Sequence, residues 1–179
     1  MTARRGFVAG VKAMGPVLLG IAPFGLISGV AAVDVGMDPL QIMGMSLLIF
    51  AGTSQLAAID LVAQRASAPV VILTVAVINI RMMMYSASIA PYLRDLSARW
   101  RSLLAYLLTD HVYALAIVAV EDDDRPVTVK WYVLGLGAAI WIVWQVSTVA
   151  VSSSGRPFPT SGGSGLSSRS PSSPSSSPN

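Results

Sequence analysis

The sequence contains no cysteine and few charged residues. Of its 179 residues, only 12% are Asp, Glu, Lys or Arg, whereas soluble domains carry about 25%. The absence of cysteine excludes disulfide bonds, thiolate nucleophiles and cysteine-based metal sites. The scarcity of charge excludes an ordinary soluble domain, so water is not the main solvent of this chain.

Further absences narrow the chemistry. The chain has no GxxxxGK[ST] phosphate loop and no GxSxG nucleophile motif, so neither nucleotide hydrolysis nor a serine hydrolase is indicated. With a single histidine, we interpret the run of three methionines at 82–84 as apolar packing and not as metal ligands. The basic residues lie in short loops and form no single face, which argues against nucleic-acid binding. We expect no enzyme, cofactor or metal.

Long apolar runs dominate what is present. Runs of about 20 residues, at 1.5 Å per residue, match the roughly 30 Å hydrocarbon core of a bilayer. We therefore predict an all-α, polytopic transmembrane helical bundle that contains broken or re-entrant helices. Its five hydrophobic segments are expected at about residues 13–33, 39–59, 66–92, 102–120 and 131–151. Together they form a transmembrane permease domain, residues 1–151.

The composition changes abruptly at Ser152. Residues 152–179 are rich in Ser, Pro and Gly and contain few large apolar side chains. Such a segment cannot bury enough surface to offset its ordering entropy, so we predict a disordered tail. Because the last apolar segment is cut off in mid-pattern, we favour a non-native end or an altered reading frame over a linker.

The loop charges predict a topology. Arg4, Arg5 and Lys12 precede the first segment and place the N-terminus in the cytoplasm of a bacterial inner membrane. Five simple crossings would then put the basic loop 94–101 outside, against the positive-inside rule. We hypothesise that segment 66–92 enters and returns on one side, with half-helices meeting near residues 79–81 and the acidic loop 121–124 external. A re-entrant segment 39–59 would also fit.

Prolines and glycines predict local breaks. Proline removes an amide donor and clashes with the preceding turn, so we expect a kinked or unwound helix around Pro16, Pro23 and Gly25. Gly25 and Gly29 also form a GxxxG pattern, which we interpret as helix packing. The cluster Gly52-Thr53-Ser54-Gln55 is either an unwound stretch that faces a solute or a set of polar packing contacts; both interpretations stay open.

Two charged residues, Arg81 and Asp110, fall near the middle of apolar segments. A charge at the bilayer centre costs about 2.5–3.5 kcal/mol on insertion scales, so each needs a compensating environment. In an amino-acid site, Arg81 and half-helix amides would bind a carboxylate, while Asp110, Gln55 and Asn79 would accept from an ammonium. Equally, the two charges form a structural pair or Arg81 reaches an interface. His111 is a secondary candidate for proton coupling beside Asp110.

Several motifs in the right order resemble one known family. They are PVLLGIAPFG at 16–25, FAGTSQ at 50–55, NIR at 79–81, YSASIAP at 85–91 and LTD at 108–110. Over about residues 5–150 the chain resembles the AzlC (azaleucine-resistance) family, the large subunits of branched-chain amino-acid exporters. Family members continue with further membrane segments where this chain turns to Ser and Pro, and His111 departs from the acidic or amide residue expected after the Asp.

The resemblance implies export of Leu, Ile, Val or similar amino acids with a small hydrophobic AzlD-type partner subunit in the lipid bilayer. We expect alternating access driven by the proton-motive force, with Asp110 and His111 as coupling candidates. A non-transporting membrane scaffold or assembly subunit is the alternative. The expected substrate-binding residues are Gly52, Thr53, Ser54, Gln55, Asn79, Arg81 and Asp110.

Overall fold

The computed structural model describes residues 2–122 and 126–152, and within these ranges it is helical with no strand. The predicted all-α fold class is confirmed. The predicted tail beyond residue 152 lies outside the described residues. The elements are α1 (Ala3–Asp34), α2 (Pro39–Ile49), α3 (Gly52–Ala63), α4 (Ala68–Ile89), the short 3-10 helix η1 (Ala90–Leu93), α5 (Ala98–Leu107), α6 (Asp110–Asp122) and α7 (Pro126–Ser152).

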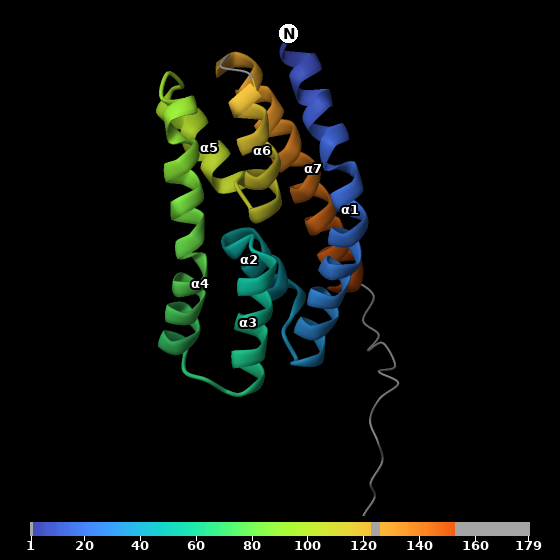
Figure 1. Cartoon of the computed structure of the whole chain (residues 1–179). Coiled ribbons are helices and arrows are strands. Elements are labelled where there is room, and N and C mark those ends of the chain that lie inside the picture. Colours follow the sequence, from blue (N-terminus) through green and yellow to red (C-terminus); the bar gives the residue numbers. More distant parts are fainter. Residues whose placement is uncertain (1, 123–125, 153–179) are drawn as a thin grey trace, which may run out of the picture.

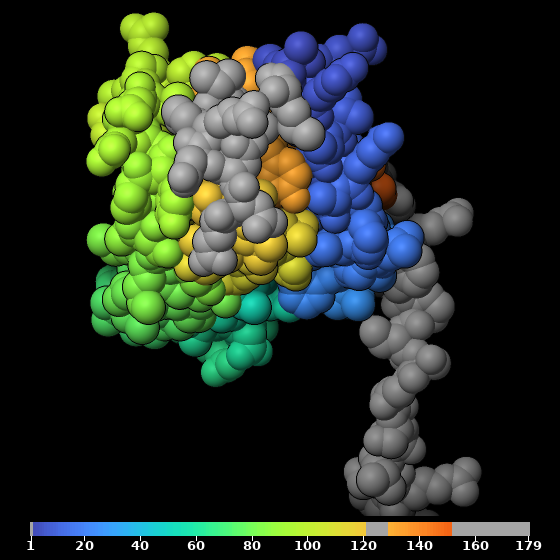
Figure 2. Space-filling model, turned by 45° about the horizontal axis from the view of Figure 1, so that its top comes forward, coloured from blue at the N-terminus to red at the C-terminus, as the bar shows by residue number. Residues whose placement is uncertain are grey.

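Three of these helical stretches are long and apolar enough to cross a membrane. They are Ala3–Asp34, Ala68–Leu93 and Val129–Val151. Figure 1 shows α1 and α4 running along most of the height of the molecule, with α7 beside α1 over its upper part. In Figure 2, α6 and α7 lie between α4 and α1 at the N-terminal end of the bundle.

The other two predicted segments are pairs of shorter helices. Residues 39–59 divide into α2 and α3, and residues 102–120 divide into α5 and α6. In Figure 1, α2 and α3 occupy the lower half, α5 and α6 occupy the upper half, and both turns lie at mid-height. Each pair therefore enters and leaves on one side.

The hypothesis of a re-entrant segment 66–92 is wrong, because α4 continues through residues 79–81 without a break. Residues 79–81 contain no proline or glycine that would break the helix. The alternative, a re-entrant segment 39–59, is confirmed. The turn within 102–120 was not predicted.

Each re-entrant pair belongs to one of two structural repeats, which run in opposite directions through the molecule. The order of one long helix and two short ones occurs first as α1, α2, α3 and then as α4 with η1, α5, α6, with the direction reversed (Figure 1). α2 and α5 begin at residues 39 and 98, a shift of 59, and α3 and α6 begin at residues 52 and 110, a shift of 58. Inverted repeats with discontinuous helices are common in membrane transporters, where their interface holds the solute.

The loop between α4 and α5 lies at the same end of the molecule as the N-terminus (Figure 1). Arg94 and Arg99 therefore share an end with Arg4 and Arg5, which agrees with the positive-inside rule. The expectation that the acidic stretch lies at the end opposite the N-terminus is wrong, since α6 ends at Asp122 at the same end as the N-terminus. The re-entrant pair α5 and α6 explains the difference, and acidic residues contribute little to orientation.

α1 is one continuous helix that contains both Pro16 and Pro23, so the predicted unwinding is not observed. Membrane helices tolerate proline where neighbouring helices support the backbone, and α1 packs along its length against α7. Gly25 serves this packing, because a Cβ there would lie 2.9 Å from the Cβ of Ser147. The interpretation of the GxxxG pattern as helix packing is confirmed.

The contact between α1 and α7 depends on glycine near the N-terminal end as well. A Cβ added at Gly10 would lie 2.2 Å from the carbonyl oxygen of Tyr132, and one at Gly135 would lie 2.2 Å from that of Phe7. These neighbours are backbone atoms, which cannot move independently of their helix. Only glycine permits the two helices to approach this closely.

We predict that Gly10→Ala lowers the free energy of unfolding by about 1–3 kcal/mol, because the added methyl group forces α1 and α7 apart. The matched control is Gly20→Ala in the same helix, where an added Cβ meets nothing within 4 Å. That control is expected to be neutral or slightly stabilising. Thermal unfolding in detergent measures both, and equal midpoints for the two variants would contradict the packing argument.

Candidate functional site

The two mid-height turns line a common cavity of about 80 Å³. The turn between α2 and α3 contributes residues 50–53, and the turn between α5 and α6 contributes residues 109–111. The remaining lining side chains come from α1, α4 and α7 and are Ile21, Phe24, Met82, Ile140 and Trp144. Both halves of the inverted repeat thus meet at one place inside the molecule.

The first turn depends on a strained residue. Phe50 has φ 37° and ψ 42°, a left-handed conformation that is uncommon for a bulky side chain. Its ring stacks on Tyr106 of α5, with 5.6 Å between centroids. The Tyr106 hydroxyl also donates to the carbonyl oxygen of Leu47 at 2.8 Å, which satisfies one of the last carbonyls of α2. The second half of the repeat therefore holds the break of the first half in place.

The starts of two helices line the cavity. α3 begins at Gly52 and α6 begins at Asp110, so the first amides of both helices lie beside it without intrahelical acceptors. α2 and α5 end at Ile49 and Leu107 on the opposite side of each turn. Helix amino ends favour anions. The cavity thus offers the amino ends of two helices to an anionic group.

An ion pair connects the two turns through α4. Arg81 lies 3.1 Å from Asp110, and its guanidinium also donates to the hydroxyl of Thr53. The two charged side chains are 32% and 36% exposed, so other protein groups cover each of them only in part. The pair that the sequence allowed as a structural alternative therefore forms, and it lies next to a cavity that Thr53 and Asp110 both line.

The remaining predicted residues lie behind the cavity. Ser54 is fully buried and donates to Asn79 of α4 at 2.7 Å. Gln55 is 1% exposed. Of the predicted set, Gly52, Thr53 and Asp110 line the cavity together with His111, whereas Ser54, Gln55, Asn79 and Arg81 do not line it.

Several polar atoms around the cavity are buried and make no hydrogen bond within the described part of the chain. They are Arg81 Nε, Asp110 Oδ1, Thr109 Oγ1, Trp144 Nε1 and Gln55 Oε1. Buried polar groups in native proteins almost always have a partner, so each exception calls for an explanation such as an ion, a water molecule or a ligand. Their concentration beside two helix breaks makes this cavity the candidate functional site.

Sequence reasoning missed part of the surroundings. Gln145 of α7 is buried and accepts a hydrogen bond from Ser46 of α2 at 3.0 Å, which ties the first re-entrant pair to α7. An amide within the apolar segment 131–151 was an available signal. Phe24 and Ile140 gave no signal, because apolar residues at membrane depth are equally common in lipid contacts and cavity walls.

The fold and the site together define a polytopic helical membrane protein with a polar, ionisable site at mid-depth. It combines three long apolar helices, two re-entrant pairs and a charge pair between the two breaks.

The sequence profile of the family described as AzlC protein matches residues 16–155. The chain belongs to the AzlC family, as its motifs indicated. No solved structure matches it significantly.

Curated relatives are also membrane proteins. The chain is 28% identical over 150 residues to "Inner membrane protein YgaZ" of Escherichia coli K12, a match that covers 83% of this chain and 61% of the relative. It is 31% identical over 133 residues to an "Uncharacterized membrane protein" of Archaeoglobus fulgidus, covering 74% of this chain and 55% of the relative. The chain thus spans about three fifths or less of the length of these relatives.

We predict that Arg81 and Asp110 are energetically coupled. Removing either charge leaves the other without its partner, so Arg81→Gln and Asp110→Asn should each destabilise the protein, while the double variant should lose less than the sum. Because both side chains are about one-third exposed, a coupling of roughly 1 kcal/mol is expected. A double-mutant cycle of thermal unfolding in detergent measures it; losses that add within about 0.5 kcal/mol would refute the coupling.

Proposed function

We propose that the chain is the membrane-embedded part of a permease that exports apolar, branched-chain amino acids. The observation that carries this proposal is the meeting of both helix breaks at one mid-depth cavity, which Asp110 lines while it pairs with Arg81. Membership of the AzlC family supports it, because that family is related to branched-chain amino-acid export. In this proposal the chain catalyses no reaction and needs no cofactor.

The lining fits the three parts of an amino acid. The amides of Gly52 and Thr53, at the start of α3, would donate to the carboxylate, with Arg81 nearby. The Oδ1 atom of Asp110, which makes no hydrogen bond within the described residues, would accept from the ammonium. An apolar wall that includes Trp144 would contact the side chain. Since one methylene is worth only about 1–3 kcal/mol in such a pocket, the substrate range should be broad.

The proposal also covers the membrane in which the protein lies and its partner subunit. We place the protein in a bacterial inner membrane with its N-terminus in the cytoplasm, because the basic residues gather at that end. The E. coli relative carries the words "inner membrane" in its name. A small hydrophobic AzlD-type subunit would complete the exporter, as the family resemblance implies.

A membrane scaffold or assembly subunit is the second candidate. It is favoured by the closed Arg81–Asp110 pair, whose 3.1 Å separation is that of an ordinary structural ion pair. In a scaffold, loss of the pair would reduce assembly without any separate effect on solute movement. The two candidates therefore differ in one measurable quantity, the rate of transport per assembled molecule.

We predict that cells carrying this chain and its small partner subunit release preloaded leucine, isoleucine and valine faster than cells without them. Asp110→Asn should lower efflux at least about tenfold at equal membrane abundance, because the solute loses a charged acceptor. Asp60→Asn is the matched control: Asp60 is an exposed carboxylate of α3 that bonds Gln64 away from the cavity.

Two results would count against the exporter. Unchanged efflux on expression of the unmodified chain, at confirmed membrane abundance, would defeat the assignment. If Asp110→Asn instead lowers abundance and partner binding while efflux per molecule stays constant, the scaffold is the better description.

We also predict proton coupling. In everted vesicles with an acidic interior, leucine added outside should partly dissipate the pH gradient, because each exported leucine would exchange for a proton. Asp110→Asn should lose this response, whereas His111→Gln should keep most of it, since Asp110 is the group that pairs with Arg81. A pH-sensitive dye follows the gradient. Leucine uptake that leaves the gradient unchanged would refute proton coupling while leaving transport intact.

A further inference from the structure

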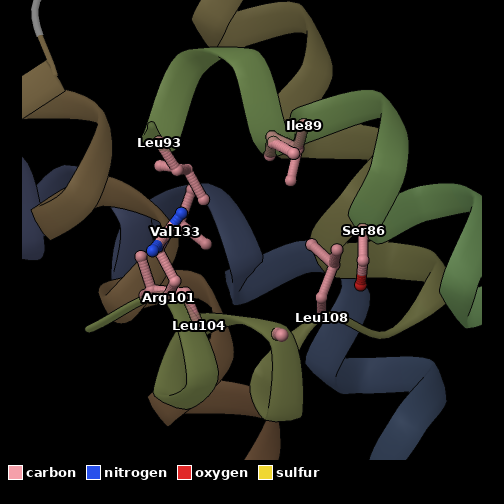
Figure 3. Close-up of a pocket in the computed structure, with 9 residues that line it drawn as sticks. Ser86, Ile89, Leu93, Arg101, Leu104, Leu108 and Val133 are labelled. Carbon is pink, nitrogen blue, oxygen red and sulfur yellow. The ribbon is translucent and has the colours of Figure 1, made fainter. Parts of the chain in front are cut away.

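A second cavity, of about 170 Å³, lies between α4, η1 and α5. It is on the side of the molecule toward the end where the N-terminus lies (Figure 1). Figure 3 shows its lining. Seven of the nine lining residues are apolar, and the two polar ones are Ser86 and Arg101. The cavity therefore has an apolar interior with one cationic group.

Arg101 places a positive charge at one end of the cavity. Its guanidinium nitrogens lie beside Leu93 and Val133, at the opposite end of the cavity from the hydroxyl of Ser86 (Figure 3). Among the described residues Arg101 forms no ion pair, since the ion pair there joins Arg81 and Asp110. An unpaired cation beside apolar walls suits a ligand that carries an anionic group on an apolar body.

The cavity is continuous in sequence with the mid-depth site. Ser86 lies one helical turn beyond Met82, and Met82 lines the mid-depth cavity from the same helix. Leu108 lines the second cavity and directly precedes Thr109, which lines the first. One face of α4 and the end of α5 thus lead from the basic end of the molecule to the helix breaks.

The two cavities differ in volume, at about 80 Å³ for the mid-depth cavity and about 170 Å³ for the cavity between α4 and α5.

The inverted half carries a corresponding cavity. It measures about 540 Å³, is more open, and lies along the second half of α1, toward the opposite end of the molecule. The long helix lines it at positions that correspond across the repeat with a shift of 59 residues: Ile27, Val30, Ala31 and Asp34 in α1, and Ser86, Ile89, Ala90 and Leu93 in α4 and η1. Corresponding faces of α1 and α4 therefore each line a cavity. The two cavities lie toward opposite ends of the molecule.

We propose that the cavity between α4 and α5 is a loading site for the exported amino acid. Arg101 binds the carboxylate, the apolar walls hold the side chain, and the solute then moves along α4 to the mid-depth site. This inference rests on the proposed export function and adds a second binding site, on the N-terminal side of the membrane, with Arg101 as its specificity residue for a free carboxylate.

The test measures leucine uptake into everted vesicles that contain the full chain and its partner subunit, with the N-terminal face outward as checked by protease access. Arg101→Ala is expected to raise the KM for leucine about tenfold and to leave the maximal rate within about twofold, because binding weakens before the transport step. Arg101→Lys should recover most of the affinity. Arg99→Ala is the matched control, since Arg99 is exposed on the same helix and does not line the cavity.

A second variant tests the cavity without changing charge. Ala105→Phe places a ring in the cavity and should raise the same KM, whereas Ala98→Phe, on the exposed start of α5, should not. In vesicles of the opposite orientation, where leucine reaches the other face, Arg101→Ala should leave the KM unchanged. A residue that acted only on folding would alter both directions.

The outcomes separate the two proposals. If the unmodified chain transports leucine but Arg101→Ala and Arg99→Ala have equal KM values on the N-terminal face, the loading site is refuted and the export function stands. An equal rise of KM on both faces would also refute it. If the unmodified chain moves no leucine, the export function and the loading site are both refuted.

Discussion

Four helix ends in the middle of the bundle are the constraint on which the rest of the structure depends. A helix end leaves backbone amides or carbonyls unpaired, and lipid offers them no hydrogen-bond partner. The breaks can exist only where the protein covers them. Here Arg81 of α4 bonds a side chain at each break, Thr53 at one and Asp110 at the other. Tyr106 of α5 donates to the carbonyl oxygen of Leu47 near the end of α2. The second half of the repeat thus supports the break of the first half.

The long helices make this arrangement possible. α1 and α7 approach each other closely through Gly10 and Gly135, and their contact forms a rigid wall beside the breaks. α7 then holds the first re-entrant pair by the buried bond between Ser46 and Gln145. Because α2 and α3 are too short to span a bilayer alone, they depend on this wall for their position. The glycine packing of α1 against α7 therefore helps to position the helix breaks and their polar side chains at mid-depth.

The sequence predicted the fold class and the polar positions better than the topology. Charges within apolar runs identified Arg81 and Asp110, because their cost in lipid makes them stand out. The polar cluster at residues 52–55 identified Thr53. The topology was harder, since proline proved a poor guide: α1 stays helical through Pro16 and Pro23, while the breaks fall at Phe50–Ala51 and Leu108–Thr109, which lack proline. The polar cluster at residues 52–55 marks the neighbourhood of the first break but is itself helical. Tertiary contacts, such as the Tyr106 ring on Phe50, help to fix the exact position of that break.

Because the two repeats run in opposite directions, their re-entrant pairs lie toward opposite ends of the molecule. If one half covers the break of the other, then separating a re-entrant pair from α4 exposes the mid-depth site to one end only, while the other pair still closes it. The two hollowed faces, along α1 and along α4, lie toward opposite ends and fit such an exchange. Arg81 would remain in place throughout, because α4 is continuous. In the proposed exporter, the charge pair between the two breaks would couple the opening of one side to the closure of the other.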